Sequence, residues 1–179
     1  VDVLVLTKNK TWNNSKEKND IISKLEMKGK EINLTLDIQI IDKKSFYLQY
    51  SHNPSLIYQM KDYKLIYGEI KIPNKIELSK LDLRMKLDWS DIVDENSDGK
   101  EIYYAIRNVV LVKLLLNKII DNNMLYKKLV EEIGINLMRN LKNDTASEIE
   151  KEVALSYLKE LTELTRKEIL SSKWEKIML

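Results

Sequence analysis

The stretch EINLTLDIQIID, residues 31–42, decides the fold of the first part of the chain. Its apolar and polar side chains alternate strictly up to residue 40. The apolar positions are Ile32, Leu34, Leu36, Ile38 and Ile40, and the polar positions are Asn33, Thr35, Asp37 and Gln39. A period of two is typical of a β-strand with one buried face. We therefore expect a strand over residues 32–41, with Asp37 on its polar face.

The segments around this stretch complete an α+β pattern. Residues 1–6, VDVLVL, are apolar apart from Asp2 and predict another strand. Residues 15–28 have the apolar spacing of a helix, which is followed by Gly29, a residue typical of helix ends. Residues 64–72 predict a third, short strand. We expect the three strands to form one small mixed β-sheet with flanking helices.

The hydrophobic period changes after Pro73, from alternation to stripes spaced about 3.6 residues apart. Residues 78–175 are accordingly expected to be helical and to form an all-α helical bundle. The segment 100–121 is apolar nearly all round and is expected to be its central helix. We place a domain boundary between an αβ domain, residues 1–74, and the helical bundle domain, residues 75–179.

Composition excludes several function classes. The chain has no cysteine, which excludes disulfides and thiolate chemistry. It has one histidine, His52, so metal sites built from several histidines are excluded, and we expect His52 on a surface turn. No run of about 18 apolar residues is present, so we expect no membrane partner and a cytoplasmic location.

Two carboxylates lie on predicted strands. If the strand with Asp2 pairs with the strand with Asp37, the two side chains can converge on one face of the sheet. Carboxylate oxygens held at fixed spacing are the ligands that a divalent cation needs when it also binds phosphate oxygens. The alternative is that both are ordinary polar residues on a solvated face, as strands with one buried face commonly carry. The residues alone leave both interpretations open.

In order and spacing, residues 1–70 resemble the latter part of a minimal nucleotidyltransferase domain of the polymerase-beta-like superfamily. Val1-Asp2-Val3 matches the second aspartate of the family's Asp-x-Asp motif, and Leu36-Asp37-Ile38 matches its third aspartate. The segment from Asn53 to Gly68 matches the closing helix and strand. The family's Gly-Ser turn and first aspartate have no counterpart here. We expect a missing upstream segment to carry them; the alternative is a degenerate family member.

The resemblance implies a metal-dependent nucleotidyltransferase that uses Mg²⁺ or Mn²⁺. Asp2 and Asp37 would be both the metal ligands and the catalytic residues, and Asp37 would help to activate the hydroxyl of the acceptor. The substrate would be a nucleoside triphosphate, whose monophosphate is transferred to an acceptor that the sequence does not identify.

Three cationic residues of the helical half are candidates for binding the phosphates of this nucleotide: Arg84, Lys86 and Arg107. Arg107 stands out because it is a charge within an apolar helix, and a buried arginine needs an anionic partner. The alternative for Arg107, which we favour, is an ion pair within the protein. Its candidate partners are Asp82, Asp88 and Glu101.

A function of a different class also fits the pattern. The absent turn motif and the long apolar helices suit a non-catalytic, nucleotidyltransferase-like binding module, such as an antitoxin-type protein that acts through protein partners. In that case the helical half could form the interface of a homodimer.

Overall fold

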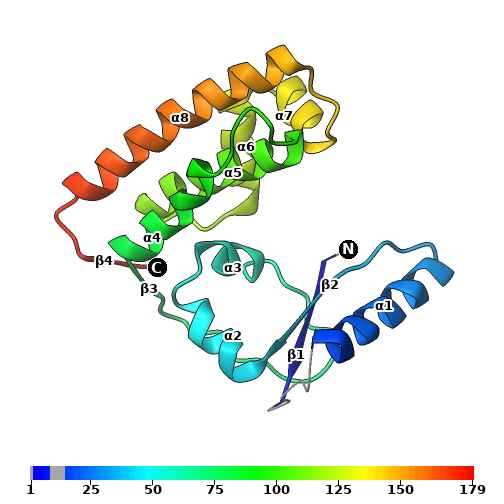
Figure 1. The fold of residues 1–179 in the computed structure, drawn as a ribbon. Coiled ribbons are helices and arrows are strands. Elements are labelled where there is room, and N and C mark those ends of the chain that lie inside the picture. Colours follow the sequence, from blue (N-terminus) through cyan, green and yellow to red (C-terminus); the bar gives the residue numbers. More distant parts are fainter. Residues whose placement is uncertain (1, 9–14) are drawn as a thin grey trace. The chain divides into compact units, whose positions relative to one another are not determined.

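The computed structural model describes residues 2–8 and 15–179, and it is a mixed α+β protein, as expected (Figure 1). The chain divides into two compact units, Val1–Tyr50 and Ser51–Leu179. This division differs from the expected boundary between residues 74 and 75. The reason is that α3 (Pro54–Gln59) packs on the long helix α5 (Gly99–Leu116) and therefore belongs to the second unit.

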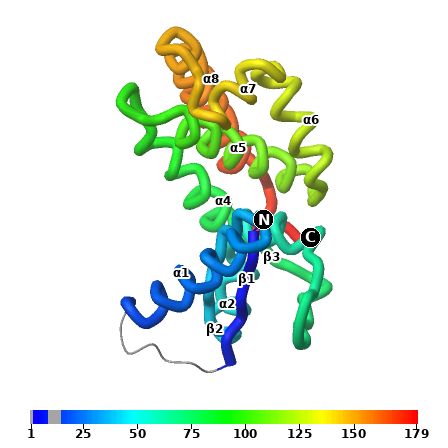
Figure 2. Tube along the Cα trace, turned by 90° about the vertical axis from the view of Figure 1, so that its right-hand side faces the viewer, coloured from blue at the N-terminus to red at the C-terminus, as the bar shows by residue number. Residues whose placement is uncertain are grey.

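The first unit is built on two parallel strands. Strand β1 (Asp2–Thr7) pairs with β2 (Asp37–Asp42), and α1 (Ser15–Glu31) lies between them in the chain. Figure 2 shows the two strands side by side. Two neighbouring parallel strands need a long crossover connection, and the segment with α1 provides it. Helix α1 contacts β2, and α2 (Lys43–Tyr50) contacts both strands.

The strand predicted over residues 32–41 begins later than expected, at Asp37. Ile32 and Leu34 are 67% and 43% exposed, so the alternating pattern does not describe a strand there. The competing structure is the end of α1, where the backbone N–H of Leu34 donates to the carbonyl oxygen of Gly29 at 2.9 Å. Asn33 adopts a left-handed conformation, with φ of 57°, which ends the helix with a tight turn.

The single three-stranded sheet is a wrong prediction. Residues 64–72 contain no strand. The third strand is β3 (Glu77–Ser79), which pairs antiparallel with β4 (Lys176–Met178) in a separate two-stranded sheet. Strands β3 and β4 also contradict the all-α character expected for residues 75–179, and β3 overlaps the start of the range 78–175 that was expected to be helical. Leu78 and Ile177 are partners in this sheet and both are buried, so the sheet is held by apolar contacts as well as by its ladder.

The second unit is mainly helical. Its further helices are α4 (Lys80–Leu87), the short 3₁₀ helix η1 (Asp88–Asp91), α6 (Asn122–Ile133), α7 (Ile135–Lys142) and α8 (Glu148–Ser171). Helix α5 contacts α3, α4, α6, α7 and α8, and it is buried over most of its surface. Figure 1 shows α8 running alongside α5. Within residues 2–8 and 15–179, none of the helices combines the length and the hydropathy needed to span a bilayer.

Candidate functional site

Asp2 and Asp37 are partners in the parallel ladder of β1 and β2. Directly opposed residues of paired strands point to the same face of a sheet, and the strands themselves lie about 4.8 Å apart. Both aspartates are exposed, whereas Ile38, the next residue along β2, is buried on the opposite face. The structure therefore brings the two predicted carboxylates together at one end of the ladder.

The two carboxylates are free to take a ligand. Within the described part of the chain, neither Asp2 nor Asp37 forms an ion pair or a side-chain hydrogen bond. The described residues also contain no cluster of three or more histidine, cysteine, aspartate or glutamate side chains suited to a metal ion. Mg²⁺ at nucleotide sites is commonly held by one or two carboxylates, with substrate phosphates and water as its other ligands. The donor set fits such a shared cation, and metal binding itself stays a prediction.

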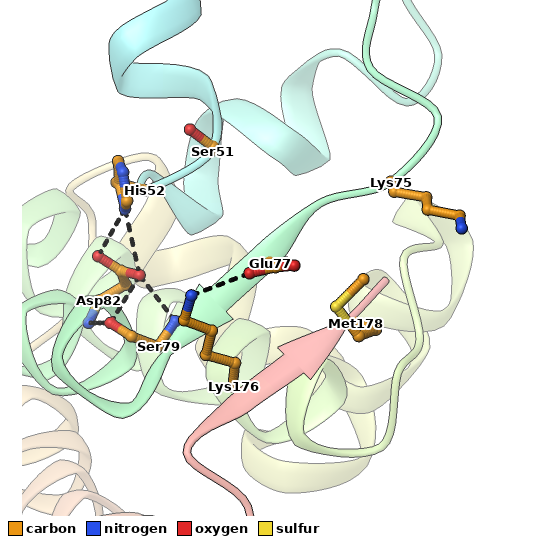
Figure 3. Close-up of a pocket in the computed structure, with 8 residues that line it drawn as sticks. All are labelled: Ser51, His52, Lys75, Glu77, Ser79, Asp82, Lys176 and Met178. Atoms are coloured by element: carbon orange, nitrogen blue, oxygen red, sulfur yellow. Dashed lines mark hydrogen bonds and ion pairs between the residues drawn. The ribbon is translucent and has the colours of Figure 1, made fainter.

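A groove of about 390 Å³ lies in the second unit (Figure 3). Its lining residues are Ser51, His52, Lys75, Glu77, Ser79, Asp82, Lys176 and Met178. His52 is exposed on a turn, as expected, and its Nδ1 lies 3.2 Å from Oδ1 of Asp82. Because a carboxylate only accepts hydrogen bonds, Nδ1 is the donor in this contact.

The other polar groups of the groove are engaged with one another. Oδ2 of Asp82 accepts hydrogen bonds from the backbone N–H and the hydroxyl of Ser79, both at 2.8 Å, and this capping box begins α4. Nζ of Lys176 lies 3.0 Å from Oε2 of Glu77. Most of the charged groups in the groove thus stabilise the β3–β4 sheet and the start of α4, and their arrangement carries no argument for a ligand.

The structure separates the three candidate phosphate-binding residues. Arg84 and Lys86 are two positions apart on α4, and residues with this spacing lie on different faces of a helix. Arg84 is exposed, whereas Lys86 is half-buried. Burial, and to a lesser extent the positive charge of Arg107 on α5, together lower the pKa of Lys86 to about 8. Lys86 and Arg107 are therefore neighbours, and Arg84 stands apart from them.

The ion pair that we favoured for Arg107 is a wrong prediction, because Arg107 forms no ion pair with any residue in the described ranges. The three candidate partners are occupied elsewhere. Asp82 binds Ser79 and His52, as described above. Oδ1 of Asp88 lies 3.8 Å from Arg166, and Glu101 accepts a hydrogen bond from the backbone N–H of the residue that caps α5.

Comparison of the chain with protein-family models, with curated proteins and with solved structures found no match.

Proposed function

We propose that this chain binds Mg²⁺ or Mn²⁺ through Asp2 and Asp37 and acts as a metal-dependent nucleotidyltransferase. The observation that supports the proposal is the register of β1 and β2, which makes these two residues direct partners. Their exposure, and their lack of other partners in the described part of the chain, leave both carboxylates available to a cation.

The roles proposed for Asp2 and Asp37 follow from their positions on β1 and β2. Both lie on paired strands, whose backbone hydrogen bonds limit the movement of the carboxylates relative to each other. When bound, the cation would supply positive charge against the triphosphate of the substrate. Asp37 would in addition accept the proton of the acceptor hydroxyl, the role that the resemblance assigns to the third aspartate.

Transfer of a labelled nucleoside monophosphate from its triphosphate, measured with and without Mn²⁺, tests the proposal. Asp37→Asn removes a ligand charge while keeping the shape of an exposed side chain, so we expect metal-dependent transfer to fall about 100-fold or more. Asp42→Asn is the matched control, because it removes a charge at the other end of β2. The side chain of Asp42 accepts a hydrogen bond from the backbone N–H of Ser45 at 2.9 Å, and the side-chain oxygen of an asparagine can still accept this bond. Unchanged transfer by Asp37→Asn would remove this residue from the mechanism.

The coding sequence upstream of Val1 offers a second, inexpensive test. A Gly-Ser pair, followed by an aspartate two positions before Asp2, would complete the motif of the family that the chain resembles. Codons for a different sequence would favour the non-catalytic binding module instead.

A further inference from the structure

A cluster of cationic and phenolic side chains lies where α4 packs on α5. On α4, Leu83 and Leu87 are fully buried, and Lys86 lies at the edge of the face that they define. On α5, Tyr103 and Arg107 are four residues apart, and such residues lie one above the other on a helix. Helix α3 contacts both α4 and α5. The cluster therefore belongs entirely to the second unit.

The two cations of this cluster have no counter-ion. Neither Lys86 nor Arg107 forms an ion pair with a described residue, although both are half-buried. Removing charges from water without pairing them is unfavourable, and a second charge of the same sign nearby adds to the cost. The lowered pKa of Lys86 has these two causes. Exposed Lys128 shows the contrast, since its pKa is raised by Glu131, which it binds at 2.8 Å.

A hydroxyl donor, Tyr103, lies about one turn from Arg107 on the same face of α5. Tyr103 is only 7% exposed, and its hydroxyl forms no hydrogen bond with a described residue. Burial raises the pKa of Tyr103, and the nearby charge of Arg107 opposes this effect, so the phenol stays protonated and can donate. The neighbouring phenol of Tyr58 is already engaged, because it donates to the carbonyl oxygen of Ile119 at 2.5 Å.

We propose that Lys86, Arg107 and Tyr103 form a binding site for the phosphate group of a small phosphorylated ligand. A phosphate dianion balances both positive charges, whereas a single carboxylate would leave one of them unpaired. The guanidinium can bind two phosphate oxygens side by side, and the ammonium acts as a compact charge. The site does not depend on Asp2 or Asp37, so it stands apart from the proposed function.

Isothermal titration of the full chain with pyrophosphate and with inorganic phosphate, at constant ionic strength, tests this site. We expect saturable binding of one pyrophosphate per chain. Lys86→Met and Arg107→Met should each weaken it about 10- to 100-fold, because each removes a charge-assisted hydrogen bond. Arg84→Met is the matched control, since it removes a charge from a different face of the same helix, and its binding should equal that of the wild type. Asp37→Asn should also bind normally.

Several outcomes would overturn the proposal: no saturable binding, unchanged binding by Lys86→Met and Arg107→Met, or an equal loss in Arg84→Met. Circular dichroism verifies that each variant folds, and Arg107→Lys, which keeps the charge but loses the second hydrogen bond, should show an intermediate loss. An oligonucleotide with and without a 5′-phosphate forms the last arm. If the oligonucleotide binds more tightly than pyrophosphate, and equally well with and without its 5′-phosphate, the ligand is a nucleic acid and the proposal of a small phosphorylated ligand is overturned.

Discussion

Replacing Lys86 with methionine should make the protein more stable at neutral pH, which is unusual for a substitution at a half-buried position. Methionine keeps the length and the apolar stem of the side chain but removes its charge. In the folded protein that charge is opposed by burial and by Arg107, which together lower the pKa of Lys86 from 10.5 to about 8.

The size of the effect follows from this shift. At about 1.4 kcal/mol per pKa unit, the shift corresponds to about 3 kcal/mol against the charged form. Water still reaches the half-buried ammonium, and allowing for its screening gives a gain of about 1–2 kcal/mol for Lys86→Met at pH 7. The folded pKa is the lower one, so the unfolded chain binds more protons between pH 8 and 10.5. The stability of the wild type therefore rises with pH through this window, and the full penalty applies below about pH 8.

Urea unfolding at pH 7, 8, 9 and 9.5 measures both effects. We expect the free energy of unfolding of the wild type to rise with pH and that of Lys86→Met to start higher and rise less. The series stops at pH 9.5 because of the tyrosines. Burial raises the pKa values of Tyr58 and Tyr103 in the folded protein, whereas tyrosines in the unfolded chain lose their protons near pH 10. Above pH 9.5 this difference would make the free energy of unfolding fall with pH. Lys128→Met, at an exposed and paired lysine, is the control and should bring no gain. A less stable Lys86→Met at pH 7, or a wild type whose stability falls between pH 7 and 9.5, would refute the reasoning.

Two further predictions concern the second unit. Gly99→Ala should lower the free energy of unfolding by about 1–3 kcal/mol, measured in urea, because its Cβ would lie 2.9 Å from the backbone oxygen of Leu141; a neutral result would mean that α7 can move away. Asp82→Ala should cost about 1 kcal/mol by removing the capping box of α4, whereas Asp82→Asn, which keeps an acceptor for Ser79, should cost less in the same assay. Equal losses in the two variants would contradict the capping argument.

The alternation of apolar and polar residues correctly predicted a strand where short-range sequence pattern alone determines the structure. Ile38 and Ile40 alternate with exposed residues, and the strand over them is present. The same alternation failed at Leu34, because the backbone carbonyl of Gly29 captures the N–H of that residue at the end of α1. A hydrophobic period records which side chains could share a face, but it does not record this competing hydrogen bond.

Features that depend on distant parts of the chain were harder to predict. Strands β3 and β4 have three residues each, too few to show a period, and Glu77 and Lys176 meet across 99 positions. The sequence showed that Arg107 is a charge within an apolar helix. It did not show that Lys86 lies near Arg107, because this proximity depends on how α4 packs on α5. The convergence of Asp2 with Asp37 was predictable only if their strands paired, and the register now shows that they do.

Binding of Mn²⁺ observed by NMR tests the central claim, the shared cation of Asp2 and Asp37, most directly. Mn²⁺ broadens the signals of nuclei close to it, so it locates a site without any assumption about the acceptor. We expect substoichiometric Mn²⁺ to broaden the amides at the starts of β1 and β2 first, around residues 2–4 and 37–39. The broadening should be lost in Asp37→Asn and kept in Asp42→Asn. Broadening centred elsewhere in the chain, or unchanged in Asp37→Asn, would contradict the account.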